Sequence, residues 1–419
     1  MLIFTILYLY KNKTLVLLSD NYPCSNGEFF LDDEINIIAS SFEKITILCI
    51  SSKTESIRTV PDNVDVIIIP EISSIKLFFY RIKGLFFLPL WQELFSLKKR
   101  YDLYPRFLFF KILLEDYAKS SHIIQVIVSN RLTDPAKHIL YSYWYDYKAL
   151  AIARIRNKTG CRAISRCHRW DIYFYANNPP FLPYRQFLFN KLTLSCSISQ
   201  DGVSYIRALH KISDANKLVV CRLGKINEFQ PRLENNNKEH IVICSCSMLI
   251  HVKRVHLIVE FISKLSKSKT IKWIHFGDGK LKENLISYAS VLLEYKNFHI
   301  MGIKPNTEIM TFYKQNYVDL FINFSESEGI PVSIMEAQSA GIPVLATAVG
   351  GVTEIVNNEN GFIVDKDFDM DDVIMKIRDY LSSSQEVITA KRQASYDNWN
   401  QKYNAKKNYK LFAEELLGL

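Results

Sequence analysis

The sequence lacks an apolar run long enough to cross a membrane. Residues 1–10 are apolar but are followed by Lys11 and Lys13, so the run is far shorter than the roughly 20 residues that a transmembrane helix needs. It also has no basic leader of the kind that begins a signal peptide. Residues 77–97 are rich in aromatics but contain Arg81, Lys83, Gly84 and Pro89, which leaves an interfacial amphipathic segment and a buried helix pair as alternatives.

The chain also lacks a C-x-x-C pair, although it contains eight cysteines. Cys244 and Cys246 form the only close spacing, and alternate residues of a strand point to opposite faces, so these two thiols would not share a metal ion. Scattered, unpaired thiols fit a reducing compartment. No low-complexity tract indicates disorder.

What is present begins with length and charge. A chain of 419 residues exceeds one ordinary hydrophobic core, so we expect two domains. Residues 1–225 hold 30 Lys and Arg against 19 Asp and Glu, whereas residues 226–419 hold 22 against 24. The basic first half indicates either an acidic partner, such as a membrane surface, nucleic acid or phosphorylated substrate, or a basic surface without a partner.

Short apolar runs rich in Val, Ile and Leu alternate with longer amphipathic stretches. Runs without polar alternation are typical of strands buried on both faces of a parallel sheet, and their order favours an α/β fold with right-handed crossovers. One or two of the runs are open to being helical, because periodicity cannot classify short runs. The expected strands are 14–20, 44–50, 65–70, 123–130, 138–144, 162–168, 194–199, 217–223, 240–247, 271–277, 298–302, 320–325, 343–347 and 362–364.

The expected linker is the polar, Asn-rich segment 226–239. It separates a first domain, 1–225, from a second, 240–395, and each contains enough predicted strands for its own sheet. The tail, 396–419, is expected to be helical, with the option that it packs back on the first domain. Its candidate packing residues are Trp399, Tyr403, Phe412 and Leu416.

Residues 319–364 predict a strand, a tight loop, a helix and a second strand. The first strand ends near Ser325. Pro331 suits the first helical position, where its missing N–H costs nothing, and Gly341 suits the residue after the helix. The free amides at the helix start therefore form a place where a phosphate can bind.

Two glutamates, Glu328 and Glu336, flank this helix start, and carboxylates are good acceptors for the hydroxyls of a sugar or ribose. Their E-x7-E spacing around the letters GIPVSIM resembles the donor-binding signature of retaining glycosyltransferase family 4, whose GT-B architecture has two Rossmann-like parallel-sheet domains facing across a cleft. The resemblance implies that Glu328 orients the donor sugar and that Glu336 binds the nucleotide ribose. It also places Gly329, Ile330 and Pro331 in the donor site.

Upstream, residues 241–265 resemble the strand and loop with which the family grips the donor diphosphate through a basic pair. Lys253 matches the family's lysine, but Ser247 stands where many members have arginine, and Arg254 replaces the usual glycine. The second charge is therefore assigned either to Arg254 or to a residue of the other domain. The stretch near Gly302 matches the part whose backbone meets the base.

The first half resembles the family more loosely. Gly27 matches the glycine loop after the first strand and, with Glu28, is expected to face the cleft. His168 matches a histidine that faces the sugar in members that build surface polysaccharides, so we expect it to contact the donor sugar or the acceptor. A histidine at a strand end is otherwise often a structural residue. Its neighbours in the sequence are Arg166, Arg169 and Asp171.

The resemblance implies glycosyl transfer from a nucleotide-diphosphate sugar to a hydroxyl with retention of anomeric configuration. Lys253 and backbone amides would stabilise the leaving diphosphate. No D-x-D motif in the sequence is suited to holding Mg²⁺ between phosphates, which predicts that neither a metal nor a cofactor is needed. Gly277-Asp278-Gly279 lacks the third glycine of a dinucleotide fingerprint, which argues against an oxidoreductase. The alternatives are a sugar-nucleotide epimerase of the same architecture and a catalytically degenerate partner subunit, supported only by Ser247.

The resemblance and the basic first half together predict the acceptor and the location. We expect a lipid-linked oligosaccharide of a bacterial capsule or lipopolysaccharide as the acceptor, and no nucleic acid. Lys98, Lys99 and Arg100 follow the aromatic segment 77–97 and are expected to hold the first domain against an anionic membrane. The expected location is therefore cytoplasmic and peripheral, on the inner face of the plasma membrane.

Overall fold

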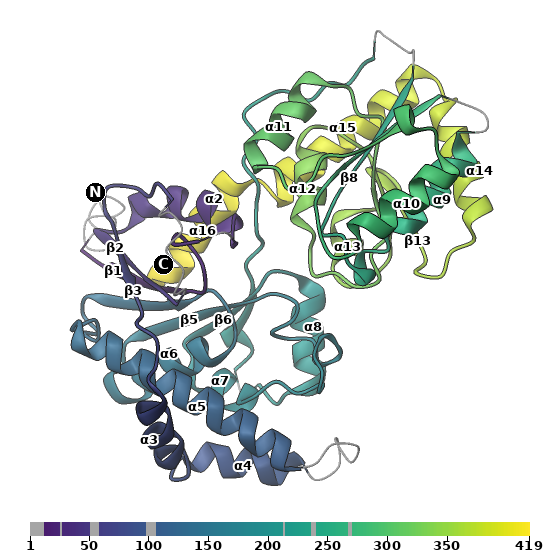
Figure 1. The fold of residues 1–419 in the computed structure, drawn as a ribbon. Helices are drawn as coiled ribbons and strands as arrows, with labels where there is room; N and C mark the ends of the chain where they lie inside the picture. Colours follow the sequence, from purple (N-terminus) through teal and green to yellow (C-terminus); the bar gives the residue numbers. More distant parts are fainter. Residues whose placement is uncertain are drawn as a thin grey trace. The chain divides into compact units, whose positions relative to one another are not determined.

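The computed structural model describes residues 12–25, 27–50, 58–97, 106–212, 214–235, 240–266 and 270–419. Residues 1–10 and the basic triplet Lys98, Lys99 and Arg100 lie outside these ranges. The chain divides into two compact units: Met1–Arg222 with Lys406–Leu419 form the first, and Leu223–Ala405 form the second (Figure 1).

The first unit is built on a seven-stranded sheet in the order β3-β2-β1-β4-β5-β6-β7. All neighbouring strands are parallel, and β1 and β4 are buried along almost their full length, as strands covered on both faces are. The strands are β1 Thr14–Ser19, β2 Lys44–Cys49, β3 Val64–Ile68, β4 His138–Ser142, β5 Arg162–Cys167, β6 Leu194–Ser197 and β7 Leu218–Val220. The helices are α2 Phe30–Ile38, α3 Ser74–Gly84, α4 Leu88–Ser96, α5 Arg106–Ser129, α6 Tyr147–Thr159, α7 Arg185–Lys191, α8 Gln200–Leu209 and α16 Ala405–Leu417.

The second unit has a six-stranded parallel sheet in the order β10-β9-β8-β11-β12-β13. Its strands are β8 Ile241–Cys246, β9 Ile271–Phe276, β10 Phe298–Ile300, β11 Leu320–Asn323, β12 Val344–Thr347 and β13 Gly361–Val364. Its helices are α9 Val255–Leu265, α10 Lys282–Leu292, α11 Asn306–Gln315, α12 Val332–Ser339, α13 Val352–Ile355, α14 Met370–Leu381 and α15 Gln385–Lys402. The strand order reverses between β8 and β11, and such a switch point is where open parallel sheets bind ligands at their carboxyl ends.

One predicted strand is wrong. Residues 123–130 belong almost entirely to α5, which ends at Ser129. Ile123, Val126 and Ile127 are buried in the core of the first unit, and their spacing of three and four residues is that of one helix face. The other predicted strands contain or overlap observed strands, so the expected α/β class with two parallel sheets is confirmed.

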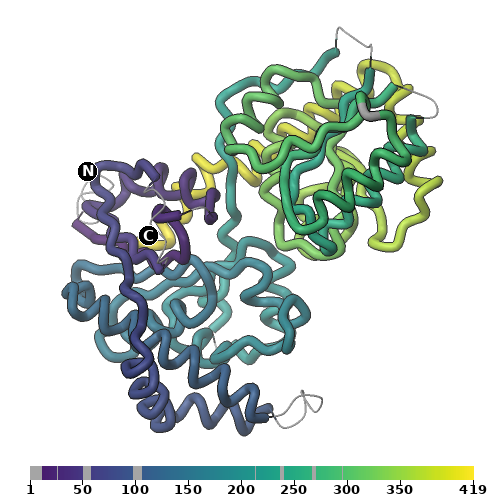
Figure 2. Tube along the Cα trace, in the orientation of Figure 1, coloured from purple at the N-terminus to yellow at the C-terminus, as the bar shows by residue number. Residues whose placement is uncertain are grey.

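The C-terminal tail is two helices rather than one, because α15 ends at Lys402 and α16 begins at Ala405. The four candidate packing residues of the tail are buried, with exposed fractions of 3% or less. α16 belongs to the first unit, and Figure 2 shows the yellow end of the chain among the elements of that unit. The Phe412 ring packs 5.3 Å from the Tyr141 ring of β4, while Arg162 donates to the carbonyls of Leu416 and Glu415 at 2.9 and 2.7 Å.

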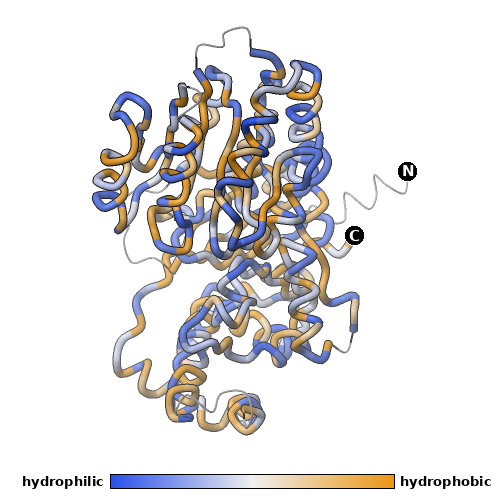
Figure 3. The backbone as a smooth tube through the Cα atoms, turned by 90° about the vertical axis from the view of Figure 1, so that its right-hand side faces the viewer, coloured by the Kyte–Doolittle hydropathy of each residue, from blue (hydrophilic) through white to orange (hydrophobic). Residues whose placement is uncertain are grey.

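Apolar residues gather in the helices at one end of the first unit. In Figure 3 the hydrophobic colour covers coils at the lower end of the tube. There α3, α4 and the turn between them expose large apolar side chains, among them Ile75 at 71%, Phe86 at 86% and Phe95 at 66%. Within the described ranges no helix combines the length and the apolar character that a membrane span requires.

Candidate functional site

Lys253 and Glu328 meet at the switch point of the second sheet. Lys253 ends a short turn after β8, and Glu328 lies in the loop after the neighbouring strand β11. The Lys253 Nζ lies 2.5 Å from Glu328 Oε1, and the Glu328 side chain is only 8% exposed. The same oxygen accepts from Ser325 Oγ at 2.6 Å. Two residues predicted for the donor site are thus brought together with compensated charge.

Two glycines that follow β12 support the Glu328 loop from behind. A Cβ at Gly350, whose φ is +50°, would lie 2.1 Å from the Glu328 carbonyl oxygen. A Cβ at Gly351 would lie 2.6 Å from the Gly329 carbonyl oxygen. Only residues without a side chain allow this backbone approach. These two glycines were not predicted to belong to the site, although an adjacent glycine pair in the sequence is a visible signal of a close contact.

The helix after the Glu328 loop begins one residue later than predicted. Pro331 is the N-cap of α12, with φ −69° and ψ 122°, and Val332 is the first helical residue. The extended ψ explains the shift, because helical residues need a negative ψ. Gly341 has φ +69°, as expected for the residue that ends the helix. The first amides of α12 therefore follow the buried residues Gly329, Ile330 and Pro331.

Glu336 lies on α12 and is buried with an exposed fraction of 6%. Its Oε1 accepts a hydrogen bond from Asn306 Nδ2 at the start of α11, a partner that the sequence analysis missed. Burial raises the pKa of the Cys246 thiol at the end of β8, the charge of Glu336 raises it further, and Lys253 lowers it. Glu336, Cys246 and Lys253 therefore share one electrostatic environment.

Ser247 and Gly302 belong to the backbone frame of this site. The Gly302 carbonyl accepts from the Gly277 amide at 2.9 Å, which joins the carboxyl ends of β9 and β10. Gly277 packs so closely on Ser247 that a Cβ would lie 1.9 Å from the Ser247 carbonyl oxygen. That oxygen lies 3.2 Å from His275 Nε2. Burial lowers the pKa of His275 to about 4, so this histidine is neutral and structural.

Arg254, in the loop after β8, forms hydrogen bonds to the loops that follow β11 and β13. Its φ of +45° is left-handed, and its Nε and Nη1 donate to the carbonyls of Phe324 and Lys366 at 2.7 and 3.0 Å. Lys366 Nζ in turn lies 3.2 Å from Glu326 Oε1. Arg254 is therefore placed beside the Glu328 loop, where it binds backbone carbonyls that follow β11 and β13.

In the first unit, both carboxylate oxygens of Glu28 accept hydrogen bonds from neighbouring residues. Its carboxylate accepts from the amides of Asn21 and Tyr22 at 2.7 and 2.8 Å and from Trp144 Nε1 at 2.5 Å. The Gly27 carbonyl accepts from Arg58, and Gly27 has φ +129°. The side chain of Glu28 is 7% exposed, so it organises the loop after β1 instead of presenting a free carboxylate.

His168 follows β5 and lies among aromatic rings. Its ring centroid is 4.5 Å from those of Tyr143 and Trp144, and its Nδ1 lies 3.5 Å from Asp171 Oδ2. Burial alone would raise the pKa of Asp171, but its bonds to His168 and to the Tyr145 amide hold that pKa below its usual value. The aspartate is therefore ionised beside the imidazole. His168 belongs to the first unit, whereas Lys253 belongs to the second.

Arg166, two residues before His168 in the sequence, is fully buried in the first unit. It lies on β5 and points into the core, where it lies 3.1 Å from Glu34 and 3.9 Å from the Phe412 ring centroid of α16.

A second ion cluster, which was not predicted from the sequence, lies at the loops that follow β1 and β4. Lys148 Nζ lies 2.7 Å from Asp20 and 2.6 Å from Asp146. Burial would lower the pKa of Lys148, but these two carboxylates raise it, so the lysine is charged.

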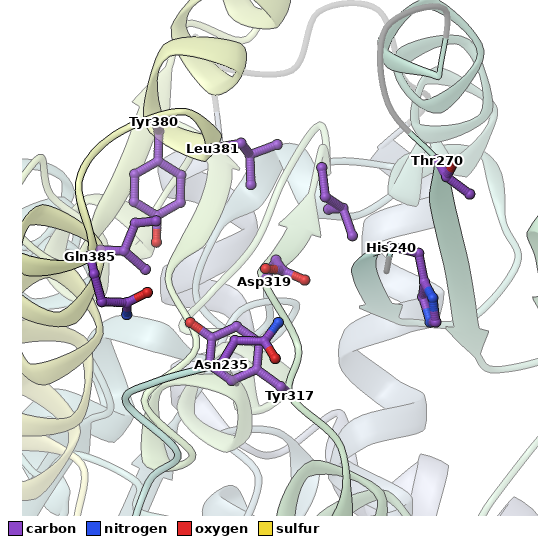
Figure 4. A pocket seen from close by; sticks show the side chains of 10 residues that line it. Asn235, His240, Thr270, Tyr317, Asp319, Tyr380, Leu381 and Gln385 are labelled. Carbon is purple, nitrogen blue, oxygen red and sulfur yellow. The ribbon is translucent and has the colours of Figure 1, made fainter. Parts of the chain in front are cut away.

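A cavity of about 310 Å³ lies at the other end of the strands of the second sheet, beside the amino ends of β8, β9 and β11. Figure 4 shows Asp319, Tyr317 and Tyr380 around it. Burial raises the pKa of Asp319, whose Oδ2 accepts from the Val242 amide at 2.8 Å. Because ligands of parallel sheets bind at the carboxyl ends, this cavity is separate from the Lys253–Glu328 site.

Comparison with known proteins agrees with this geometry. The two parallel-sheet Rossmann-like units are those of the GT-B fold class. Residues 226–401, which include Lys253, Glu328 and Glu336, match the family model "Glycosyl transferases group 1". Among solved structures, the apo form of the lipopolysaccharide outer core galactosyltransferase WaaB has a TM-score of 0.64 at 14% identity, over 96% of this chain and 99% of that chain.

Two curated relatives are each similar over a little more than two fifths of the chain. The O-antigen biosynthesis glycosyltransferase WbnH of Escherichia coli is 31% identical over 179 residues, 42% of this chain and 48% of the relative. The capsular polysaccharide biosynthesis glycosyltransferase CapM of Staphylococcus aureus is 29% identical over 200 residues, 43% of this chain and 51% of the relative. The chain thus spans about half the length of these relatives.

Proposed function

We propose that this chain is a glycosyltransferase of surface polysaccharide biosynthesis that uses a nucleotide-diphosphate sugar as donor. The observation that carries the proposal is the Lys253–Glu328 pair at the switch point, 2.5 Å apart and beside the amino end of α12. A cation and free helix amides are suited to a leaving diphosphate. The similarity to glycosyltransferases of O-antigen and capsule synthesis supports the same reaction class.

The resemblance to retaining family 4 supplies the finer assignment. Lys253 and the α12 amides stabilise the diphosphate as its bond to the sugar anomeric carbon breaks. Glu328 orients the sugar, and Glu336 binds the ribose hydroxyls. The acceptor hydroxyl then forms its new bond on the face that the leaving group vacates and passes its proton to the departing diphosphate, so the configuration is retained. His168 contacts the donor sugar or the acceptor, and neither a metal nor a cofactor takes part.

The acceptor in this proposal is a lipid-linked oligosaccharide at the inner face of the plasma membrane. The exposed apolar side chains of α3 and α4 and the basic first half support contact with an anionic lipid surface, where aromatic residues settle at the headgroup level. Nucleic acid has no place in this reaction. The enzyme itself would remain in the cytoplasm, where nucleotide sugars are available.

A donor screen that measures nucleotide release tests the proposal. The full chain is incubated with a panel of nucleotide-diphosphate sugars, with and without bacterial lipid extract. We expect release from one donor, stimulated by the extract, and loss of that release in Lys253→Ala. Retention is checked by NMR of the anomeric proton in the product. If no donor releases nucleotide above the level of Lys253→Ala, the proposed function is wrong.

A further inference from the structure

A cavity of about 490 Å³ lies between α4 and α7 in the first unit. Its volume is in the range of about 300–1,000 Å³ that is usual for pockets binding small organic ligands. None of the residues assigned above to the donor or to the acceptor lines it. α4 contributes Pro89, Gln92 and Ser96, and α7 contributes Gln186 and Asn190.

The cavity has apolar walls and a basic rim. Phe174, Phe181 and Leu182 form part of its walls. Lys191 lines it at the end of α7, and the Lys191 ammonium bonds to none of the residues that the structure describes. Lys217 Nζ lies 3.4 Å from the carbonyl of the lining residue Asn190, which adds a second ammonium to the same rim.

Among the residues that the structure describes, Glu93 is the one acidic side chain that lines the cavity, and it carries little charge at neutral pH. Burial raises the pKa of Glu93 to about 8, although Arg185 and a hydrogen bond from the Tyr184 amide lower it, and Asp116 raises it again. Arg185 also lines the cavity, and its guanidinium donates to the Asp171 carbonyl at 2.8 Å. The cavity is therefore positively charged around an apolar interior.

One wall of the cavity continues into the exposed apolar surface of α4. Leu88 and Phe95, seven residues apart, are 64% and 66% exposed. At 100° per residue, Gln92 lies about 40° from Leu88 and about 60° from Phe95 around the helix, and Gln92 lines the cavity. A ligand in the cavity can therefore extend onto this apolar face without leaving the first unit.

We propose that this cavity binds the phosphate group of a lipid, whose hydrocarbon chain follows the apolar walls onto the exposed face of α4. A basic rim recognises a phosphate through charge-assisted hydrogen bonds, and the aromatic walls remove hydrocarbon from water. The inference rests on the proposed lipid-linked acceptor. The lipid is either a polyprenyl phosphate that carries the acceptor or a membrane phospholipid, because both present a phosphate on a hydrocarbon chain.

Calorimetry on the full chain tests the site with four probes: farnesyl phosphate, dihexanoyl phosphatidic acid, farnesol and inorganic phosphate. We expect at least one of the two lipid phosphates to bind, and farnesol and inorganic phosphate to bind at least tenfold more weakly. Binding of farnesyl phosphate alone identifies the polyprenyl source, and binding of phosphatidic acid alone identifies the phospholipid. Equal binding of inorganic phosphate and the lipid phosphates would overturn the proposal.

Three variants locate the site. Lys191→Gln combined with Lys217→Gln should weaken binding of the lipid phosphate about tenfold, since each removes a charged partner. Gln92 is exposed and lines the cavity, so the larger side chain of Gln92→Trp should fill the cavity and abolish binding of the lipid phosphate. Lys137→Gln removes an exposed lysine before β4 that does not line the cavity, and it should leave binding of the lipid phosphate unchanged. Wild-type affinity in the double variant and in Gln92→Trp would overturn the proposal.

The nucleotide-release screen is run on the same preparations, so the two failures are distinguishable. In one outcome the variants lose lipid phosphate binding but the wild type turns over no donor. The lipid site would then be supported and the proposed function would be wrong. In the other outcome the wild type turns over a donor but the variants bind the lipid phosphate like wild type. The proposed function would then stand, and the proposal that this cavity binds a lipid phosphate would be wrong.

Discussion

Glu328 and Glu336 are both buried carboxylates, but their surroundings predict different roles. Glu336, held by Asn306, is assigned to the ribose, so Glu336→Ala should weaken binding of the donor nucleotide. Losing a charge-assisted hydrogen bond costs about 1.5–3 kcal/mol, which is about tenfold or more in affinity. Glu328→Ala should mainly lower turnover, because the proposed function assigns Glu328 to orienting the sugar. Calorimetry and nucleotide release measure the two effects.

The matched control for both variants is Glu283→Ala, which removes an exposed glutamate from α10 of the same unit. It should bind the donor and turn over like wild type. Wild-type binding and turnover in Glu328→Ala and Glu336→Ala as well would show that the donor site lies elsewhere.

Gly350 and Gly160 allow backbone strain to be separated from steric contact. Both have a positive φ, +50° and +79°, but a Cβ at Gly160 meets nothing within 4 Å, whereas one at Gly350 meets the Glu328 carbonyl oxygen at 2.1 Å. Gly160→Ala should lower the free energy of unfolding by about 1 kcal/mol through strain alone. Gly350→Ala should lower it further and also reduce turnover, because the Glu328 loop must move.

Chemical denaturation and nucleotide release on the two alanine variants check this. Equal losses of stability, with full turnover in Gly350→Ala, would mean that the glycine does not support the catalytic loop.

The meeting of Lys253 and Glu328 could be predicted, whereas contacts in the first unit could not; the donor-site role of the pair stays a prediction. Lys253 and Glu328 were predictable as neighbours, because the resemblance to family 4 assigned both to one site and each follows a strand of the same parallel sheet. Glu28 and Arg166 were not, because their partners Trp144 and Glu34 are far away in the sequence. No local sequence pattern distinguishes a carboxylate that accepts hydrogen bonds from nearby backbone amides from one that binds a ligand.

At the scale of elements, Arg254 decides how the loops after β8, β11 and β13 are joined. Arg254→Gly keeps the left-handed backbone free of strain but removes the bonds to the Phe324 and Lys366 carbonyls. We expect a moderate loss of stability and a larger loss of turnover, because the Glu328 loop is no longer fixed. Arg254→Lys should recover part of the turnover through one carbonyl.

Steady-state kinetics and thermal unfolding of both Arg254 variants test this role. Unchanged turnover in Arg254→Gly, at any melting temperature, would show that the joined loops do not position the site. Lys366→Ala is the control, because it removes the Glu326 ion pair but leaves the Lys366 carbonyl in place.

Elements were predictable from the sequence where burial on both faces of a strand leaves a short apolar run. The rule failed at 123–130, where α5 carries an apolar stretch of strand-like length inside a 24-residue helix. Residues 106–122 include charged side chains, so the run read as separate from its own helix. The left-handed φ of Arg254 had only one sequence signal, its position in place of a glycine.

At the scale of the whole molecule, the proposed mechanism needs no metal ion. Lys253 and the amides of α12 supply the positive potential at the diphosphate. Nucleotide release should therefore persist in excess EDTA, at a rate within twofold of that without chelator. Loss of turnover on chelation, restored by Mg²⁺ or Mn²⁺, would contradict the metal-free mechanism.

The distribution of apolar and basic residues predicts where the molecule works. Phe78, Phe79 and Phe86 are 59%, 57% and 86% exposed, and the exposed lysines Lys76 and Lys83 accompany them on α3. Basic residues near an anionic surface contribute about 1 kcal/mol each, and the effect falls with salt. We therefore expect reversible, salt-sensitive flotation of the chain with vesicles that contain phosphatidylglycerol, and little flotation with neutral vesicles.

Substitutions within α3 and the following turn separate this surface from general stickiness. Phe78→Ser, Phe79→Ser and Phe86→Ser together should abolish flotation, because apolar contact and charge act jointly at the headgroup level. Val291→Ser removes an apolar side chain that is 82% exposed in the second unit and should have no effect. Lys98→Glu, Lys99→Glu and Arg100→Glu together should weaken flotation and make it less sensitive to salt. If the wild-type chain ignores anionic vesicles at low salt, the aromatic surface does not meet lipid, and a soluble acceptor replaces the lipid-linked one.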